Sequence, residues 1–121
     1  MPNHDMKYLV EHFVDWGEQR GLHNTVDLRP QFIKLAEEMG ELAAAIARDN
    51  PAGVRDSVGD MLVVLAQLGA VAANKWYPKD PDGRTWMRLN FLRHCMEVAW
   101  TEIKDREGRT RDGVFVKEDP K

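Results

Sequence analysis

The sequence predicts an all-α protein, a four-helix bundle-like protomer in a single domain. Apolar residues recur every three or four positions in four segments, as in amphipathic helices, and no segment alternates convincingly like a strand. The chain has 121 residues, the length of one typical domain, with 43% hydrophobic and 31% charged residues. We therefore expect one domain over residues 1–121, with a helical core at about 5–106 and a charged tail at 107–121.

Four helices are expected, separated by glycine, proline and aspartate residues. They run from Asp5 to about Arg20, from Pro30 to about Asp49, from roughly Ala52 to Trp76, and from Trp86 to about Arg106. Asn50-Pro51 ends the second helix and caps the third, because proline lacks a backbone donor and suits a first helical turn. Residues 77–85 are expected to be a loop, and the run around Asp112-Gly113 is expected to be too short for an independent strand pair.

The expected third helix is apolar on nearly every side. Between Met61 and Ala73, only Gln67 has a polar side chain. A chain of this size has little protein with which to cover a helix completely. We therefore expect the protein to form a homodimer or homotetramer through this helix.

Charge and cysteine content exclude several classes of protein. The formal net charge is −3, from 17 Lys+Arg and 20 Asp+Glu, which argues against a dedicated nucleic-acid binder. The lone Cys95 excludes an internal disulfide and fits a reducing compartment. No membrane span of about 18 apolar residues and no signal peptide is expected, so the predicted location is cytoplasmic.

Carboxylates border the apolar stripes of the second and third helices. Glu38 and Glu41 lie one turn apart on the second helix, with Gln31 and Lys34 on the same flank, whereas Glu37 is directed toward solvent or behind the other two. Such pairs are commonly only a solvated helix face.

The third helix carries a second pair, Asp56 and Asp60, also one turn apart. Oxygen ligands on two facing helices suit Mg²⁺ or Mn²⁺, and a cation would relieve the repulsion among the carboxylates. A di-iron or di-manganese bundle is a weak alternative, because none of the four histidines follows a glutamate at the required spacing.

Two motifs resemble those of a known family. The run Glu37-Glu38-Met39-Gly40-Glu41-Leu42, followed by Asp56-Ser57-Val58-Gly59-Asp60, resembles the EExxE … ExxD pattern of the MazG-like nucleoside triphosphate pyrophosphohydrolases. These proteins belong to the all-α NTP pyrophosphatase superfamily. The C-terminal segments 102–109 and 112–118 resemble the ends of small stand-alone members, many of them phage-encoded. The resemblance covers about Gln31 to Glu118.

The resemblance implies an Mg²⁺-dependent enzyme that hydrolyses (d)NTPs at the α–β bond, for nucleotide pool control or housecleaning. It assigns catalytic and metal-binding roles to Glu38, Glu41 and Asp60. Ser57 replaces a family glutamate, so Asp56, Glu37 or water is expected to supply the missing ligand. The residues expected to bind substrate are Gln31, Lys34, Thr101, Lys104, Arg106 and Arg109, where Thr101 stands in place of a family asparagine.

Two further interpretations remain open. A nucleobase pocket near the start of the second helix would be formed, as a weak preference, by Trp16, Phe13 and His23. Aromatic residues on amphipathic helices are more commonly part of the core. The alternative function is a non-catalytic helical dimer that mediates protein interaction, with its acidic residues merely solvating it.

Overall fold

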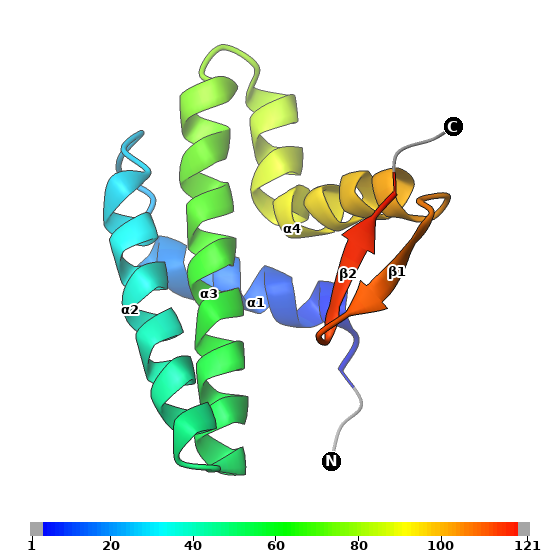
Figure 1. The fold of residues 1–121 in the computed structure, drawn as a ribbon. Helices are drawn as coiled ribbons and strands as arrows, with labels where there is room; N and C mark the ends of the chain where they lie inside the picture. Colours follow the sequence, from blue (N-terminus) through cyan, green and yellow to red (C-terminus); the bar gives the residue numbers. More distant parts are fainter. Residues whose placement is uncertain (1–3, 119–121) are drawn as a thin grey trace.

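A computed structural model describes residues 4–118, and four helices account for most of them. The helices are α1 (Met6–Gln19), α2 (Arg29–Ala47), α3 (Pro51–Trp76) and α4 (Pro81–Ile103). α2 and α3 form an antiparallel pair, and α1 and α4 both pack against α3 and against each other (Figure 1). The prediction of a mostly helical protein is confirmed.

Two helix starts share one local signal. Asn50 caps α3 by accepting a hydrogen bond from the Gly53 N–H at 3.1 Å, and a proline follows it. Asp80 caps α4 in the same way, accepting from the Gly83 N–H at 3.1 Å. The prediction that the fourth helix begins at Trp86 is therefore wrong, because α4 begins at Pro81. The helix ends at Ile103, three residues before the predicted end at about Arg106.

The core surrounds the C-terminal half of α3. Val14 from α1 packs there against small residues of α3, with Leu89 and Leu92 of α4 beside them. Gly69 allows the close approach of α4, because a Cβ at this position would lie 2.6 Å from Cδ1 of Phe91. Small residues of α3 thus allow α1 and α4 to pack closely against it.

Apolar side chains on other helix faces are not covered within one chain. The predicted apolar stripe of α2 includes Phe32, Met39 and Ile46, which are exposed, as are Val58 and Leu62 in the N-terminal half of α3. Within one chain, α3 is therefore covered mainly along its C-terminal half.

α3 also has the length and the composition of a membrane-spanning helix. An 18-residue window within it has a mean hydropathy of 1.4, and half of that window is buried within the chain. The buried helix at the centre of a soluble protein has the same features, so this finding is weak support for a membrane location.

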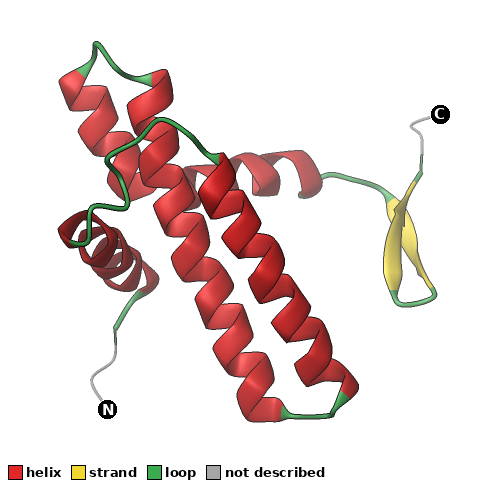
Figure 2. Ribbon diagram, turned by 90° about the vertical axis from the view of Figure 1, so that its left-hand side faces the viewer, coloured by secondary structure: helices red, strands yellow, loops and turns green. Residues whose placement is uncertain are grey.

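The expectation that the C-terminal tail contains no strand pair is wrong. β1 (Gly108–Arg111) and β2 (Val114–Lys117) form an antiparallel hairpin. Asp112 and Gly113 have φ angles of 53° and 79°, and two residues with positive φ are what a two-residue type I′ hairpin turn requires. The hairpin lies beyond the end of α4 and away from α2 (Figure 2). Residues 119–121 of the predicted tail lie outside the described residues.

Candidate functional site

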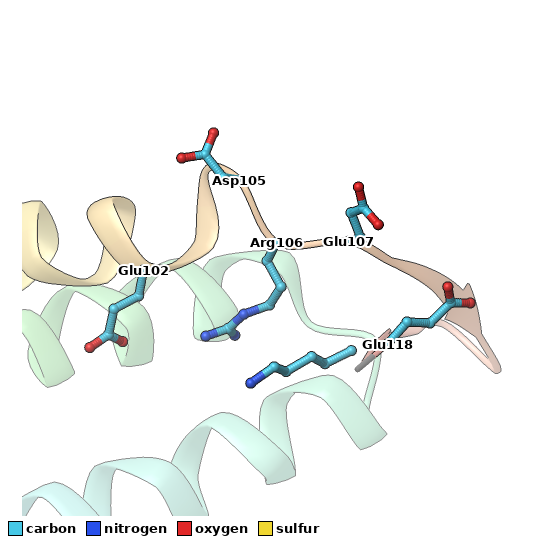
Figure 3. A pocket seen from close by; sticks show the side chains of 6 residues that line it. Glu102, Asp105, Arg106, Glu107 and Glu118 are labelled. Carbon is cyan, nitrogen blue, oxygen red and sulfur yellow. The ribbon is translucent and has the colours of Figure 1, made fainter. Parts of the chain in front are cut away.

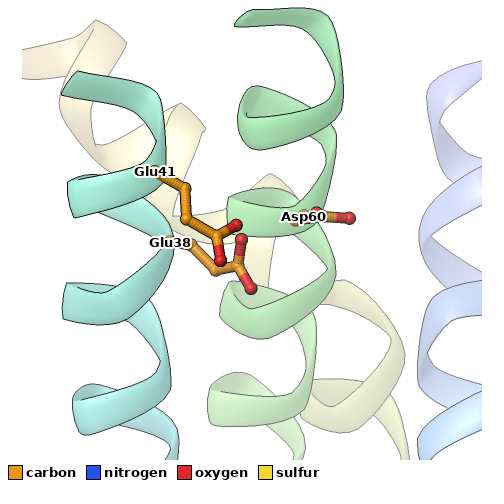
Figure 4. Close-up of side chains that lie close together, drawn as sticks. All are labelled: Glu38, Glu41 and Asp60. Carbon is orange, nitrogen blue, oxygen red and sulfur yellow. The ribbon is translucent and has the colours of Figure 1, made fainter. Parts of the chain in front are cut away.

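Three of the predicted metal ligands come together between α2 and α3. Glu38 and Glu41 extend from successive turns of α2 toward α3, which carries Asp60 (Figure 4). One carboxylate oxygen from each residue lies within 4.8 Å of the others. The one-turn spacing on α2 places the two glutamates side by side, and the packing of α2 against α3 adds the aspartate.

Glu38 is the buried member of this cluster. Its side chain has one oxygen, Oε1, at 3.4 Å from Nζ of Lys34, whereas Oε2 is buried and has no hydrogen-bond partner among the described residues. An unpaired buried carboxylate oxygen costs free energy. A cation bound at the cluster would supply the missing partner.

Glu41 is exposed, and its carboxyl lies beside that of Glu38. The adjacent Glu38 carboxyl raises the pKa of Glu41, first because a protonated Glu41 can donate a hydrogen bond to it and then through charge repulsion. The donor set is therefore all oxygen, anionic and mutually repulsive, which matches the preference of Mg²⁺ and Mn²⁺.

The two remaining predicted ligands lie outside the cluster. The carboxylate of Glu37 is largely exposed and lies 3.5 Å from Nζ of Lys34. Asp56 is exposed, whereas the adjacent Ser57 is buried. Neither of the carboxylates that were candidates to replace the family glutamate at Ser57 therefore joins Glu38, Glu41 and Asp60 in this arrangement.

A cleft of about 450 Å³ adjoins the cluster. Glu38 and Asp60 of the cluster line it, and so do the predicted substrate-binding residues Gln31 and Lys34. The other lining residues, most of them apolar, come from α1, the loop after α1, and α3: they are Trp16, Leu22, Val63, Val64 and Gln67. One cavity thus combines acidic residues of the cluster with several apolar side chains.

A buried polar network supports the wall of this cleft. Oε1 of Gln67 lies 2.6 Å from Nε2 of His23, and Nε2 of Gln67 donates a hydrogen bond to the Phe13 carbonyl oxygen at 2.7 Å. Burial lowers the pKa of His23, which favours the neutral ring. Arg88 lies 3.4 Å from Nδ1 of His23 and pairs with Glu18 at 2.9 Å. Arg88 is therefore placed to donate to Nδ1, while Nε2–H donates to Gln67.

This network was not predicted, although the sequence contained one signal for it. A single polar side chain in an otherwise apolar segment, Gln67, needs a buried partner. Of the three residues weakly preferred for a nucleobase pocket, Trp16 lines the cleft, whereas His23 and the backbone carbonyl of Phe13 bind Gln67, another lining residue.

The predicted basic substrate-binding residues lie elsewhere in the chain. Thr101, Lys104, Arg106 and Arg109 are all exposed at the end of α4 and on the hairpin. Arg106 lines a separate hollow of about 250 Å³ that also contains acidic side chains (Figure 3). Nε of Arg109 lies 3.7 Å from Glu118. Neither α4 nor the hairpin contacts α2, so one chain does not bring these residues to the acidic cluster.

One curated protein similar to this chain is a phage protein. It is described as an uncharacterised 18.2 kDa protein in the rep-hol intergenic region of Haemophilus phage HP1 (strain HP1c1). The two are 39% identical over 64 residues, which is 53% of this chain and 39% of the phage protein. The chain therefore matches well under half of that relative's length. No protein-family model matches the chain, and no solved structure matches it.

Proposed function

We propose that the protein is an Mg²⁺-dependent, MazG-like nucleoside triphosphate pyrophosphohydrolase. It would cleave (d)NTPs between the α and β phosphates, giving the nucleoside monophosphate and pyrophosphate, for nucleotide pool control or housecleaning. The observation that carries the proposal is the cluster of Glu38, Glu41 and Asp60 at one end of a cleft large enough for a small molecule.

The cluster fits a divalent cation for a reason internal to this chain. Glu38, one of the three clustered carboxylates, has a buried oxygen with no hydrogen-bond partner within residues 4–118. The three residues would hold Mg²⁺, with Mn²⁺ as a substitute, and the bound cation would neutralise phosphate charge and activate water.

The residues around the cluster suggest how the substrate is held. Nζ of Lys34 lies at the edge of the cleft beside Glu38, where it would bind a phosphate oxygen, and Gln31 lines the same cleft. Glu41 is exposed and next to Glu38, so it would accept the proton of the attacking water. The water oxygen forms the new bond to phosphorus as the bond to the bridging oxygen breaks.

The basic end of the chain enters this proposal only through a second copy. Lys104, Arg106 and Arg109 do not meet the acidic cluster of their own chain. We propose a homodimer or homotetramer in which α3 and the exposed apolar residues of α2 are covered and this basic end, with Thr101, binds substrate on a neighbouring copy. Sedimentation at micromolar concentration tests the assembly, and a compact 13.9 kDa monomer alone would contradict it.

Mixed variants test whether the site is shared between copies. Glu38→Gln inactivates the acidic cluster by removing one of its three carboxylates, and Arg106→Ala removes one charge from the basic end of the chain. If the acidic cluster and the basic end come from different copies, mixing and refolding the two variants together restores part of the wild-type activity. Activity no higher than the average of the separate variants would contradict a shared site.

Pyrophosphate release from a panel of dNTPs tests the activity itself. We expect turnover with Mg²⁺, none with EDTA, and loss of turnover in Glu38→Gln, Glu41→Gln and Asp60→Asn. Glu37→Gln and Asp56→Asn are matched controls, because they remove the same charges from the same helices outside the cluster. Turnover that persists in EDTA or in Asp60→Asn would contradict the proposed metal site.

The second candidate is a non-catalytic helical dimer that acts as a protein-interaction module. It is favoured by the exposed apolar residues Phe32, Met39 and Ile46, which are 63%, 53% and 62% exposed on α2. Self-association without any pyrophosphate release from the dNTP panel would support this candidate over the enzyme.

A further inference from the structure

We infer that the part of the cleft beside Trp16 is a nucleobase site, in which Trp16 stacks on the base and the bases are only weakly discriminated. This inference rests on the proposed function, because it assigns the part of the substrate that lies beyond the triphosphate. Glu38 and Asp60 of the acidic cluster line the cleft together with Trp16, and the neighbouring Gly17 packs on Gln67, about two turns along α3 from Asp60. The apolar Leu22 and Val63 also line the cleft. A nucleotide bound through a cation likewise places a flat apolar base some distance from its charged phosphates.

Trp16 is exposed at the edge of this cleft although tryptophan gains much from burial. The residue is 45% exposed, and Arg20 lies over its ring at 4.4 Å from the centroid. No other described residue stacks on this ring. Arg20 covers one face of the ring and does not line the cleft, whereas Trp16 does, so we place the planar ligand on the opposite face.

The position of Trp16 is fixed by the packing of α1 on α3. The adjacent Gly17 is buried against the carboxamide of Gln67, which bonds in turn to the Phe13 carbonyl of α1. Arg20 also donates to the Trp16 carbonyl oxygen at 3.0 Å. A stacking residue on a rigid helix loses little freedom when a ligand binds.

The cleft offers few fixed polar groups with which to distinguish bases. Both carboxamide atoms of Gln67 already bond within the protein, to His23 and to the Phe13 carbonyl oxygen. Gln31 is partly exposed, and its amide can turn to present either a donor or an acceptor. Sites that discriminate 10⁴-fold or more use buried hydrogen-bonding groups of fixed direction. We therefore expect kcat/KM to differ by no more than about 100-fold among the four common dNTPs.

A comparison of two ligands isolates the base. With Mg²⁺ present, we expect Trp16→Ala to weaken binding of non-hydrolysable α,β-imido dNTPs by about 5- to 150-fold, the range typical of base stacking on an aromatic side chain. Binding of inorganic tripolyphosphate should not change, because it has no base. Trp16→Phe should retain most of the nucleotide affinity.

Trp86→Ala is the matched control. Trp86 is 47% exposed on α4 and does not line the cleft, so its removal should change binding of neither ligand. Circular dichroism of each variant checks that the helices are retained.

The outcomes separate this inference from the proposed function. Equal loss of both ligands in Trp16→Ala, no loss of either, or a preference above about 1,000-fold for one base would overturn the inference. Wild-type protein that binds the imido nucleotides through Trp16 but releases no pyrophosphate from dNTPs would overturn the enzyme and leave the base site standing. Wild-type protein that binds no nucleotide would overturn both.

Discussion

Replacement of Gly17 by alanine tests whether the Gln67 network holds α1 on α3. A Cβ at position 17 would overlap the carboxamide oxygen of Gln67 and lie 2.9 Å from Nε2 of His23. A flexible exposed side chain would move aside at little cost. Gln67 is only 2% exposed and is held by two hydrogen bonds, so it has nowhere to move.

The expected loss of stability follows from the bonds that the new methyl group breaks. Displacing Gln67 leaves buried polar groups of His23 and Phe13 without partners, at about 1–3 kcal/mol each. Removing a glycine from a helix interior offsets about 0.5–1 kcal/mol of this. The net decrease in the unfolding free energy should be about 1–5 kcal/mol. At about 4 °C per kcal/mol for a domain of this size, Tm should fall by about 4–20 °C.

Urea titration and thermal scans followed by circular dichroism measure this change, with Gly40→Ala as the control. A Cβ at Gly40 meets nothing within 4 Å, so alanine there should increase stability by about 0.5–1 kcal/mol. If Gly17→Ala is stabilised to the same extent, the close packing of α1 on Gln67 is refuted. A fall in Tm confined to Gly17→Ala would support it.

Three other perturbations test the metal site, the buried histidine and a helix cap. Mg²⁺ should raise the Tm of wild type and of Asp56→Asn relative to EDTA, but not that of Glu38→Gln, because binding stabilises only a folded state that holds the cation; an equal rise in Glu38→Gln would count against this ligand. Burial lowers the pKa of His23 below 6.5, so the unfolded chain binds this proton more tightly. The contribution of His23 to the unfolding free energy is therefore complete above about pH 6.5 and declines as the pH falls toward the folded-state pKa. Urea titrations at several pH values should show that the unfolding free energy depends less on pH in His23→Gln than in wild type, and an equal dependence would contradict this. Asp80→Ala should lower the unfolding free energy by about 0.5–2 kcal/mol in the same assay, because α4 loses its N-cap, and an unchanged value would contradict that role.

Local signals in the sequence were sufficient for most of the helical architecture. The periodic apolar residues located all four helices, and Asn50-Pro51 marked the start of α3 correctly, because caps and prolines act on their own backbone. The equivalent Asp80-Pro81 pair lies in a segment that the sequence predicts to be a loop, and α4 begins earlier than that prediction. The sequence does not predict the hairpin, because the segment is short for an independent strand pair, although Asp112-Gly113 is a strong turn signal.

Helix spacing also predicted that Glu38 and Glu41 lie together, since residues one turn apart share a helix face. Asp60 joins them only because α3 folds back along α2, and the rotation of α3 that buries Ser57 leaves Asp56 outside. The contact between Gln67 and His23 joins residues 44 positions apart, a separation over which no periodic pattern operates. The sequence by itself therefore determined the helices and the side chains that each presents. Which of those side chains meet was decided by tertiary packing, because it depends on the relative rotation of helices that are distant along the chain.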